Sequence, residues 1–286
     1  MGYLKKHRWT ALFLLIILDI FIGAHMVIAS GKTLRVVMLD IGQGDAIYIE
    51  APNGRQVMFD AGPDQGVLKR LGEVMPALDR SLDVLVVTNP DKDHIGGFVP
   101  ILERYDVGAV LEPGTFNESK TYATLEEVIR SKKIPDIVAR RGMKLVLDEK
   151  NDVYIDIIFP DRDVRDWTSN DGSIVARLVY GDDSMLLMGD ATKMTEGIVL
   201  AENGAALESD VLKVGHHGSR TSTGADFVKA VASKYALISD GKNNKYGHPH
   251  KETIDTLTSV GVRILRTDLL GTIEICSTGE GFKVIE

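Results

Sequence analysis

The stretch from Thr88 to Gly97 carries the densest group of side chains that can bind a metal ion. It reads Thr-Asn-Pro-Asp-Lys-Asp-His-Ile-Gly-Gly, so an amide, two carboxylates and an imidazole fall within residues 89–94. An apolar run comes directly before it and predicts a buried strand that delivers these donors to a sheet edge. Oxygen and nitrogen donors that converge on one point suit a divalent cation. A solvated acidic loop is the alternative interpretation of this stretch alone.

The placement of the histidines favours a metal site. His7 and His25 lie in the N-terminal 30 residues, and the other five of the seven histidines lie in three loops. These five are His94, His216, His217, His248 and His250. A lone histidine is more often a satisfied core or surface residue, but histidines clustered with carboxylates at strand ends are typical of a metal centre.

Short strands separated by turns are expected to position these loops. The predicted strands cover residues 34–39, 46–50, 56–59, 82–87, 174–180, 185–188, 211–214 and 235–239, and the predicted helices cover residues 67–75, 98–105 and 225–232. The run at 82–87 predicts a central strand buried on both faces. In each half of the chain a hairpin ends on an aspartate, Asp60 or Asp190, which predicts two sheets packed between outer helices. Residues 122–150 are expected to include one helix and to be an elaboration on this scaffold.

The composition fits one globular domain over residues 31–286. A chain of 286 residues with 44% hydrophobic and 26% charged residues can fill one large core. The net charge of −8 excludes a protein that holds nucleic acid through a broad basic surface, although bound cations can still attract a polyanion at a narrow site. Cys276 is the only cysteine, which excludes internal disulfides and thiolate zinc clusters, and we expect it to be a buried apolar thiol.

Residues 1–30 predict a membrane anchor. Lys5, Lys6 and Arg8 precede an apolar run over residues 11–29, close to the ~20 residues that span a bilayer as a helix. Basic residues before such a run keep that end in the cytoplasm, so we expect the rest of the chain to be extracytoplasmic and membrane-anchored. A cleaved signal peptide, which gives a secreted protein, is the alternative. A buried soluble helix containing Asp19 is the other alternative.

Several motifs together resemble the metallo-β-lactamase superfamily. They are Asp60-Ala61-Gly62, the Asp91–His94 loop with Gly96-Gly97, Gly189-Asp190-Ala191 and Gly215-His216-His217-Gly218-Ser219, in the order expected of that superfamily. More narrowly, the stretches Leu39–Ala46 and Tyr246–His250 resemble the extracytoplasmic hydrolase-like domain of ComEC, the DNA-uptake channel protein of competence. The likeness covers roughly residues 34–275. It implies an α+β fold, a four-layer αβ/βα sandwich, preceded here by one N-terminal hydrophobic helix.

The resemblance also implies a set of metal ligands. They are Asn89, Asp91, Asp93, His94, Asp190 and His216. The superfamily loop is written H-x-H-x-D-H, and Asn89 departs from the histidine at its first position, so the first metal position is expected to be loose or empty. Asp190 resembles the carboxylate that bridges two metals, and Asp60 is expected to orient the loop rather than bind metal.

The oxygen-rich ligand set favours manganese or another hard divalent cation, with zinc as the alternative, and one or two ions. The expected reaction is attack of a metal-activated water on a phosphoryl or carbonyl centre. His217, His248 or His250 then protonates the leaving group, because imidazole titrates near neutral pH. A role of His248 and His250 in shaping a turn is the alternative.

Two further polar residues near these motifs have structural interpretations. Asp45 follows Gly42-Gln43-Gly44, and its expected role is in the backbone of that turn. Lys213 is expected either to contact phosphate or to be an exposed lysine at a strand end.

Three functions follow from the resemblance. The first is a phosphodiesterase or nuclease acting on single-stranded DNA or another phosphodiester. The second is a non-catalytic module that assists DNA uptake, and because only one candidate membrane span is found here, it would work with a separate channel protein. The third is hydrolysis of another ester. A lactam is the least favoured substrate, since the histidine-rich first metal position is missing.

Overall fold

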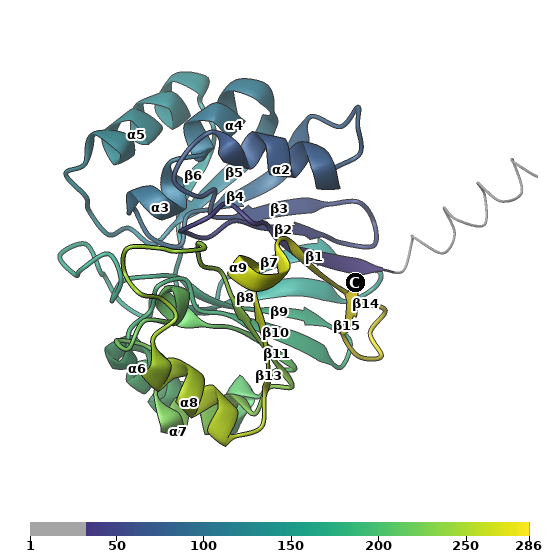
Figure 1. Cartoon of the computed structure of the whole chain (residues 1–286). Coiled ribbons are helices and arrows are strands. Elements are labelled where there is room, and N and C mark those ends of the chain that lie inside the picture. Colours follow the sequence, from purple (N-terminus) through teal and green to yellow (C-terminus); the bar gives the residue numbers. More distant parts are fainter. Residues whose placement is uncertain (1–32, 286) are drawn as a thin grey trace, which may run out of the picture.

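The computed structural model describes residues 33–285, in which two β-sheets lie face to face between two groups of helices (Figure 1). The anchor helix and the boundary predicted at residues 30–31 lie outside the described residues. Within residues 33–285, no helix combines the length and the hydrophobicity that a membrane span requires.

The first sheet has eight strands in the order β15-β14-β1-β2-β3-β4-β5-β6. Its strands are β1 (Leu34–Met38), β2 (Ile47–Glu50), β3 (Gln56–Phe59), β4 (Ser81–Val86), β5 (Asp106–Glu112), β6 (Asp136–Val138), β14 (Ile273–Ser277) and β15 (Lys283–Ile285). The pairs from β3 to β6 are parallel, and the others are antiparallel. Helices α2 (Gly66–Val74), α4 (Phe98–Arg104) and α5 (Lys120–Lys132) cover its outer face (Figure 1).

The second sheet has seven strands in the order β13-β12-β11-β10-β9-β8-β7. Its strands are β7 (Lys144–Asp148), β8 (Val153–Phe159), β9 (Val175–Tyr180), β10 (Asp183–Leu187), β11 (Val211–Lys213), β12 (Tyr235–Ile238) and β13 (Arg263–Arg266). The pairs from β10 to β13 are parallel. Helices α6 (Lys193–Asn203), α7 (Ala225–Val231) and α8 (Lys251–Ser259) cover its outer face (Figure 1). Two mixed sheets covered by helices are consistent with the predicted αβ/βα sandwich.

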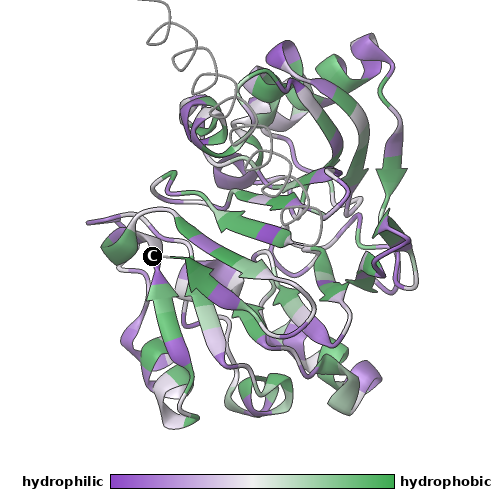
Figure 2. Ribbon diagram, turned by 90° about the vertical axis from the view of Figure 1, so that its right-hand side faces the viewer, coloured by the Kyte–Doolittle hydropathy of each residue, from purple (hydrophilic) through white to green (hydrophobic). Residues whose placement is uncertain are grey.

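The core has three apolar layers, because strands of both sheets are buried on both faces. In β1, Leu34, Val36 and Met38 pack between the sheets, whereas Val37 packs on the other side, against the layer beneath α2 and α4. A third layer lies beneath α6, α7 and α8. Hydrophobic residues accordingly run along the strands (Figure 2). Full burial of one such side chain stabilises the fold by roughly 1.5–3 kcal/mol.

The structure confirms the predicted strands and helices, but the burial predicted for β4 is wrong in its first half. Asp83 is exposed and Val84 is only half-buried. The Asp83 Oδ2 accepts a hydrogen bond from the Gln56 backbone N–H at 2.8 Å. A carboxylate in this strand therefore fixes the start of β3 instead of facing an apolar layer.

The prediction that residues 122–150 are an elaboration is wrong. After α5, this segment supplies β6 to the edge of the first sheet and β7 to the edge of the second. β6 has only three residues, all exposed, which is too short a run for the apolar alternation that identifies a half-buried strand in a sequence. The neighbouring β8 was also not predicted, although its buried Val153, Ile155 and Ile157 alternate with half-buried residues and could have identified it.

Cys276 is half-buried in β14, so the prediction of a buried apolar thiol is wrong. Its Sγ lies 3.6 Å from the Glu274 Oε1. Burial, together with the charge of Glu274, raises the pKa of the thiol to about 11. The thiol is therefore protonated near neutral pH.

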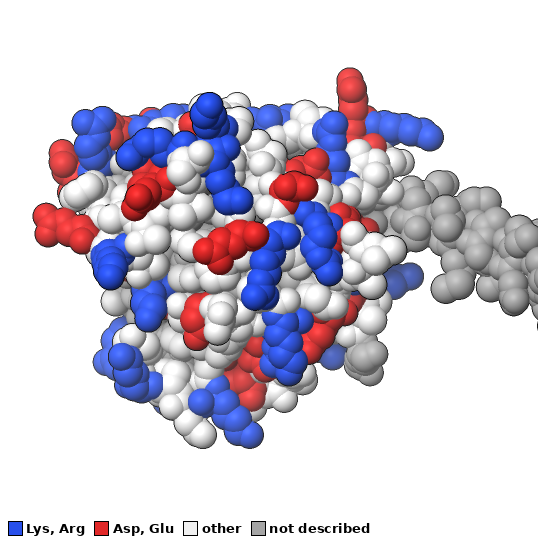
Figure 3. Space-filling model, turned by 90° about the horizontal axis from the view of Figure 1, so that it is seen from above, with Lys and Arg blue, Asp and Glu red and all other residues white. Residues whose placement is uncertain are grey.

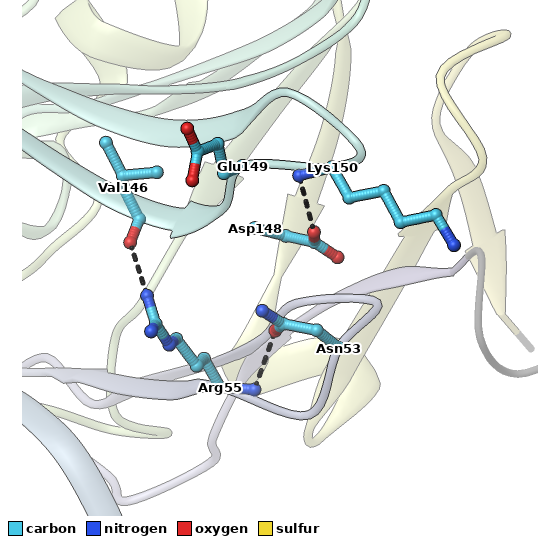
Figure 4. A pocket seen from close by; sticks show the side chains of 6 residues that line it. All are labelled: Asn53, Arg55, Val146, Asp148, Glu149 and Lys150. Atoms are coloured by element: carbon cyan, nitrogen blue, oxygen red, sulfur yellow. Dashed lines mark hydrogen bonds between the residues drawn. The ribbon is translucent and has the colours of Figure 1, made fainter.

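A hollow of about 710 Å³ lies at the end of β3 that is opposite to Asp60 (Figure 4). The Asn53 Nδ2 donates to the Leu147 carbonyl at 2.7 Å, and the Arg55 Nη1 donates to the Val146 carbonyl at 3.0 Å. These bonds join the turn between β2 and β3 to β7 of the other sheet. The hollow is therefore part of the joint between the sheets and lies away from the predicted metal ligands.

Three carboxylates gather where α5 packs beside the edge of the first sheet. Oxygen atoms of Glu112, Glu126 and Asp136 lie within 4.8 Å of one another. The Tyr122 hydroxyl donates to the Glu112 Oε2 at 3.4 Å. Burial, and then the charge of Asp136, raises the pKa of Glu112 to about 8. Burial also raises the pKa values of Glu126 and Asp136, so this cluster favours protonated carboxyls.

We expect the cluster to make the fold less stable as the pH rises. The pKa of Glu112 rises from 4.5 to about 8 on folding, so its stabilising proton is bound at low pH and is lost as the pH passes through about 8. The free energy of unfolding of the wild-type protein should fall between about pH 5.5 and about pH 8.5. Glu112→Gln should make that fall smaller by on the order of 2 kcal/mol. Urea denaturation at the two pH values measures it. Glu127→Gln, which removes an exposed carboxylate from α5, the helix that carries Glu126, is the control. An equal effect of both variants contradicts a raised pKa of Glu112 as the cause of the pH dependence.

Candidate metal centre

The predicted site residues meet at one edge of the two sheets, because the carboxyl ends of parallel strands point to the same side. Asp60 follows β3, and Asn89 lies just beyond β4. Asp190 follows β10, and His216 and His217 follow β11 in the opposite sheet. The site therefore lies between the sheets and takes side chains from both.

Asp93 and His94 lie on a single turn of helix, α3 (Lys92–Ile95), and not in the open loop that the sequence predicts. Asp91 is the residue before this turn, and the N–H groups of His94 and Ile95 bond to its carbonyl at 3.0 and 3.1 Å. The turn directs His94 into the interior, where it is buried, while Asp93 stays half-exposed.

A carboxylate lies close to each ring nitrogen of His94, but only Nδ1 is hydrogen-bonded. Its Nδ1 lies 2.8 Å from the Asp60 Oδ2, and its Nε2 lies 3.1 Å from the Asp190 Oδ2. Asp60 also accepts from the Thr88 N–H at 2.8 Å and from the Thr88 hydroxyl at 2.6 Å. Asp60 therefore orients the imidazole so that Nε2 faces Asp190, which agrees with its predicted role outside the ligand set.

His217, which follows a strand of the other sheet, is oriented in the same way as His94: its Nδ1 is hydrogen-bonded and its Nε2 faces carboxylates. Its Nδ1 donates to the Ser239 carbonyl at 3.0 Å, and its Nε2 lies 3.5 Å from the Asp190 Oδ1 and 3.6 Å from the Asp93 Oδ2. The backbone φ of 52° is in the left-handed region, which non-glycine residues rarely adopt, so a strained turn holds this ring in place. His217, predicted as a catalytic residue, therefore lies among the candidate ligands.

His216 lies further from the centre than the sequence predicts for a ligand. Its Nε2 is 3.9 Å from the Asp190 Oδ2, and its Nδ1 is 2.9 Å from the Thr221 Oγ1. It is half-buried, whereas His217 is buried. Of the two adjacent histidines, His217 is the one whose ring nitrogen points between Asp93 and Asp190.

Several buried atoms at this edge have no hydrogen-bond partner. They are the His94 Nε2, the His217 Nε2, the Asp190 Oδ1 and the Asp45 Oδ1. Buried polar atoms are nearly always hydrogen-bonded, so a group of such atoms needs a specific cause. Ligand atoms of Asp93, His94 and His217 lie within 4.8 Å of one another, as do those of Asp45, Asp190 and His217. A divalent cation fits this set, because it would satisfy lone pairs that the protein leaves unpaired.

The buried carboxylates of the site require positive charge beside them. Burial would lower the pKa of His94, but the carboxylates of Asp190 and Asp60 raise it well above its usual value. Burial likewise lowers the pKa of His217, yet Asp190 and Asp45 raise it to about 10. Burial would raise the pKa of Asp190, but His217 and His94 hold it well below its usual range. Without a cation, protons on the two imidazoles balance the carboxylates.

Asp45 and Lys213 form a buried ion pair beside the centre, which the sequence did not predict. The Lys213 Nζ contacts the Asp45 Oδ2 and donates to the Gly189 carbonyl at 2.9 Å. The two side chains are only 2% and 1% exposed, so the expectations of a backbone role for Asp45 and of an exposed or phosphate-contacting Lys213 are wrong. A Cβ on Gly44 would lie 2.1 Å from the Asp93 carbonyl oxygen, so only glycine lets this loop approach α3.

Asn89 and Asp91 are not brought into the cluster. The Asn89 Oδ1 accepts from the Asp91 N–H at 2.9 Å, and its Nδ2 donates to the Ser173 Oγ at 3.4 Å. The Asp91 Oδ1 accepts from the Asn117 Nδ2 at 3.0 Å. Asp91 belongs to none of the groups of acidic and histidine side chains that could hold a metal in the described residues. Protein partners thus occupy the two side chains predicted for the first metal position.

His248 and His250 lie on the outer side of the cluster. The His248 ring centroid is 5.6 Å from that of His216 and 6.3 Å from that of His217. Burial, and then the charge of His217, lowers the pKa of His248 to about 4. His250 lies 4.9 Å from His248, and its Nδ1 accepts from the Arg220 N–H at 3.1 Å. Neutral His250 therefore carries its proton on Nε2.

Comparison with known proteins identifies relatives of this chain. Residues 39–239 match the family model of the metallo-beta-lactamase superfamily. ComE operon protein 3 of Bacillus subtilis (strain 168) is 33% identical over 257 residues, which cover 84% of this chain and 32% of that protein. Competence protein ComA of Neisseria gonorrhoeae is 28% identical over 243 residues, which cover 84% of this chain and 32% of that protein. The chain thus spans about a third of the length of these relatives.

A solved structure shares the fold at low sequence identity. CmlA, a diiron β-hydroxylase from Streptomyces venezuelae, is 15% identical with a TM-score of 0.51, over 82% of this chain and 52% of that one. The superfamily resemblance and the likeness to competence proteins are both confirmed by these comparisons.

We expect Lys213→Met to destabilise the fold by about 3–5 kcal/mol, because it leaves the Asp45 carboxylate buried without its cation. The double variant Lys213→Met with Asp45→Asn should recover a large part of the loss. Urea denaturation in the presence of a chelator measures both. Lys234→Met is the control, because Lys234 pairs with Asp210 at the surface, where an ion pair contributes about 0–1 kcal/mol. A Lys213→Met effect no larger than the control contradicts a buried pair.

Metal affinity should distinguish the two adjacent histidines. We expect His217→Ala to weaken Mn²⁺ or Zn²⁺ binding more than about 100-fold. His216→Ala should weaken it by about tenfold or less, because about tenfold is the smallest loss of affinity typical for residues that support the ligands without binding the metal. Competition with a metallochromic chelator measures both affinities. If His216→Ala causes the greater loss, His216 is the ligand and the geometric assignment of His217 is wrong.

Proposed function

The chain belongs to the metallo-beta-lactamase superfamily, and from this membership we propose that it is an extracytoplasmic metal-dependent hydrolase, a phosphodiesterase or nuclease. The observation that carries the proposal is the set of buried, unpartnered nitrogen and oxygen atoms that face one another between the sheets. The similarity to a competence protein supports a polynucleotide as substrate.

The residues that would hold the metal are Asp93, His94, Asp190 and His217, with the free oxygen of Asp45 beside them. A bound divalent cation would supply an activated water and neutralise charge on the substrate oxygens. Mn²⁺ and Zn²⁺ are the candidate ions, as the set mixes carboxylates with imidazoles. Bonds of the Nδ1 atoms of His94 and His217 to Asp60 and to the Ser239 carbonyl leave both Nε2 atoms for the metal.

The proton for the leaving group is proposed to come from the outer histidines. His217 is committed to the metal in this proposal, which leaves His248 and His250 of the three predicted donors. The Arg220 N–H fixes the proton of neutral His250 on Nε2, so that this atom can donate. His248 lies between His250 and the cluster and can pass a proton inward.

The proposed place of the protein is outside the cytoplasmic membrane, attached to it by the apolar run over residues 11–29. In this proposal, single-stranded DNA or another phosphodiester is the substrate, and a membrane channel protein is the partner. The resemblance to ComEC-type proteins supports both.

A second candidate function is a non-catalytic module that assists DNA uptake. The hydrogen bonds that occupy Asn89 and Asp91 favour it, because they leave fewer donors for a first metal position. Metal stoichiometry separates the two functions. Less than one tightly bound equivalent after loading with manganese or zinc supports the module.

We expect the full chain to hydrolyse bis-p-nitrophenyl phosphate when Mn²⁺ is supplied, and Asp93→Ala to lower kcat more than about 100-fold, equivalent to a loss of about 2.7 kcal/mol of transition-state stabilisation. Release of p-nitrophenolate measures the rate. Asp226→Ala, an exposed aspartate on α7, is the control. If the pure, metal-loaded protein cleaves neither this ester nor single-stranded DNA, the hydrolase proposal is wrong.

A further inference from the structure

A pocket of about 520 Å³ opens beside the candidate metal centre. It is lined by Gln43, Pro63, Lys92, Asp93, Asn244, Lys245 and Tyr246. Asp93 belongs to the candidate ligand set as well, so the pocket and the metal centre share a wall. Its volume falls within the roughly 300–1,000 Å³ of ligand pockets. It therefore has room for the part of a substrate that adjoins the group reacting at the metal.

Two lysines give the pocket positive charge. Lys92 and Lys245 are exposed, and neither ammonium has an ion-pair partner among residues 33–285. The face formed by α2, α4 and α5, by contrast, carries basic and acidic side chains intermingled (Figure 3). The chain has a net charge of −8, so two neighbouring lysines without ion-pair partners are unusual in it. Their position beside the metal site favours an anionic ligand in the pocket.

An aromatic ring lies beside these charges. Tyr246 is 51% exposed and stacks on His248 with ring centroids 5.6 Å apart and an interplanar angle of 23°. The Lys245 Nζ lies 5.1 Å from the centroid of the Tyr246 ring. The stack holds the orientation of an exposed ring, and such rings bind unpaired nucleobases. Gln43 adds an amide at the pocket wall. The Asn244 amide instead fixes the loop, because its Nδ2 donates to the His248 carbonyl at 2.7 Å and its Oδ1 accepts from the Tyr246 N–H at 3.1 Å.

We infer that this pocket binds one unpaired nucleotide of a polynucleotide strand, next to the phosphodiester that lies at the metal centre. Tyr246 stacks on the base, and Lys92 and Lys245 bind the flanking phosphates. This inference rests on the proposed hydrolase function and adds to it a subsite that binds one unpaired base beside the reacting phosphodiester.

Binding to the metal-depleted protein tests the pocket separately from catalysis. A fluorescent ten-nucleotide strand of deoxythymidine is titrated with the full chain in a chelator, and anisotropy gives Kd. We expect Tyr246→Ala to raise Kd about tenfold, within the range for loss of one stacking aromatic ring, and Tyr246→Phe to keep most of the affinity. Lys92→Ala and Lys245→Ala should each reduce the slope of log Kd against log salt by about 0.7, the value for one phosphate of a single strand.

The control variant is Lys242→Ala, because Lys242 is an exposed lysine of the same loop that does not line the pocket. It should leave Kd and the salt slope unchanged. An equal effect of Lys242→Ala and Lys245→Ala, or a duplex that binds as tightly as the single strand, overturns the inference. So does wild-type affinity of Tyr246→Ala.

Hydrolysis of bis-p-nitrophenyl phosphate by the metal-loaded wild-type protein is measured in parallel. Without this hydrolysis or DNA cleavage, the proposed function fails, while Tyr246-dependent binding of the strand still supports the pocket. With hydrolysis but no Tyr246-dependent binding, the proposed function stands and the pocket inference fails.

Discussion

The surplus of buried negative charge between the two sheets is the constraint on which the site depends. Asp45, Asp60 and Asp190 are all at most 3% exposed. Lys213 is the only buried lysine among residues 33–285, and its ammonium contacts Asp45. Two unit charges 4 Å apart interact by about 4 kcal/mol at an effective dielectric constant near 20, so the carboxylates repel one another strongly unless a cation lies among them. The two buried imidazoles can supply positive charge only by taking up protons. A divalent cation supplies it without protonating the nitrogen atoms that face the cluster.

This constraint explains why both sheets are needed. Asp60 and His94 come from the first sheet, and Asp190, Lys213 and His217 come from the second. The Lys213 ammonium contacts Asp45 across the junction and binds the backbone beside Asp190, so it connects the two halves. The left-handed backbone of His216 and His217 persists because packing and hydrogen bonds on both sides fix the turn. Sheet packing and site geometry are therefore one cooperative arrangement.

The sequence predicted the fold well because its signals are local. Apolar runs that end in Asp60 and Asp190 identify strands and the edge at which they meet, and the motifs between them identify the superfamily. It failed where the information is non-local. Nothing near Lys213 in the sequence indicates that its ammonium meets Asp45, and the choice between His216 and His217 depends on the φ and ψ angles of the turn.

The same charge balance would let an acidic protein act on an acidic polymer, as we propose. A net charge of −8 repels a polynucleotide at a distance, and salt screens this repulsion beyond about 8 Å at physiological ionic strength. At short range, the local charges decide the sign of the interaction. In the proposed function, the buried carboxylates would hold a metal ion at the sheet edge, and Lys92 and Lys245 would extend the positive region into the adjoining pocket. Attraction is then confined to the place where a phosphodiester can react, which favours a narrow contact with a strand end or an unpaired segment over nonspecific coating of the polymer.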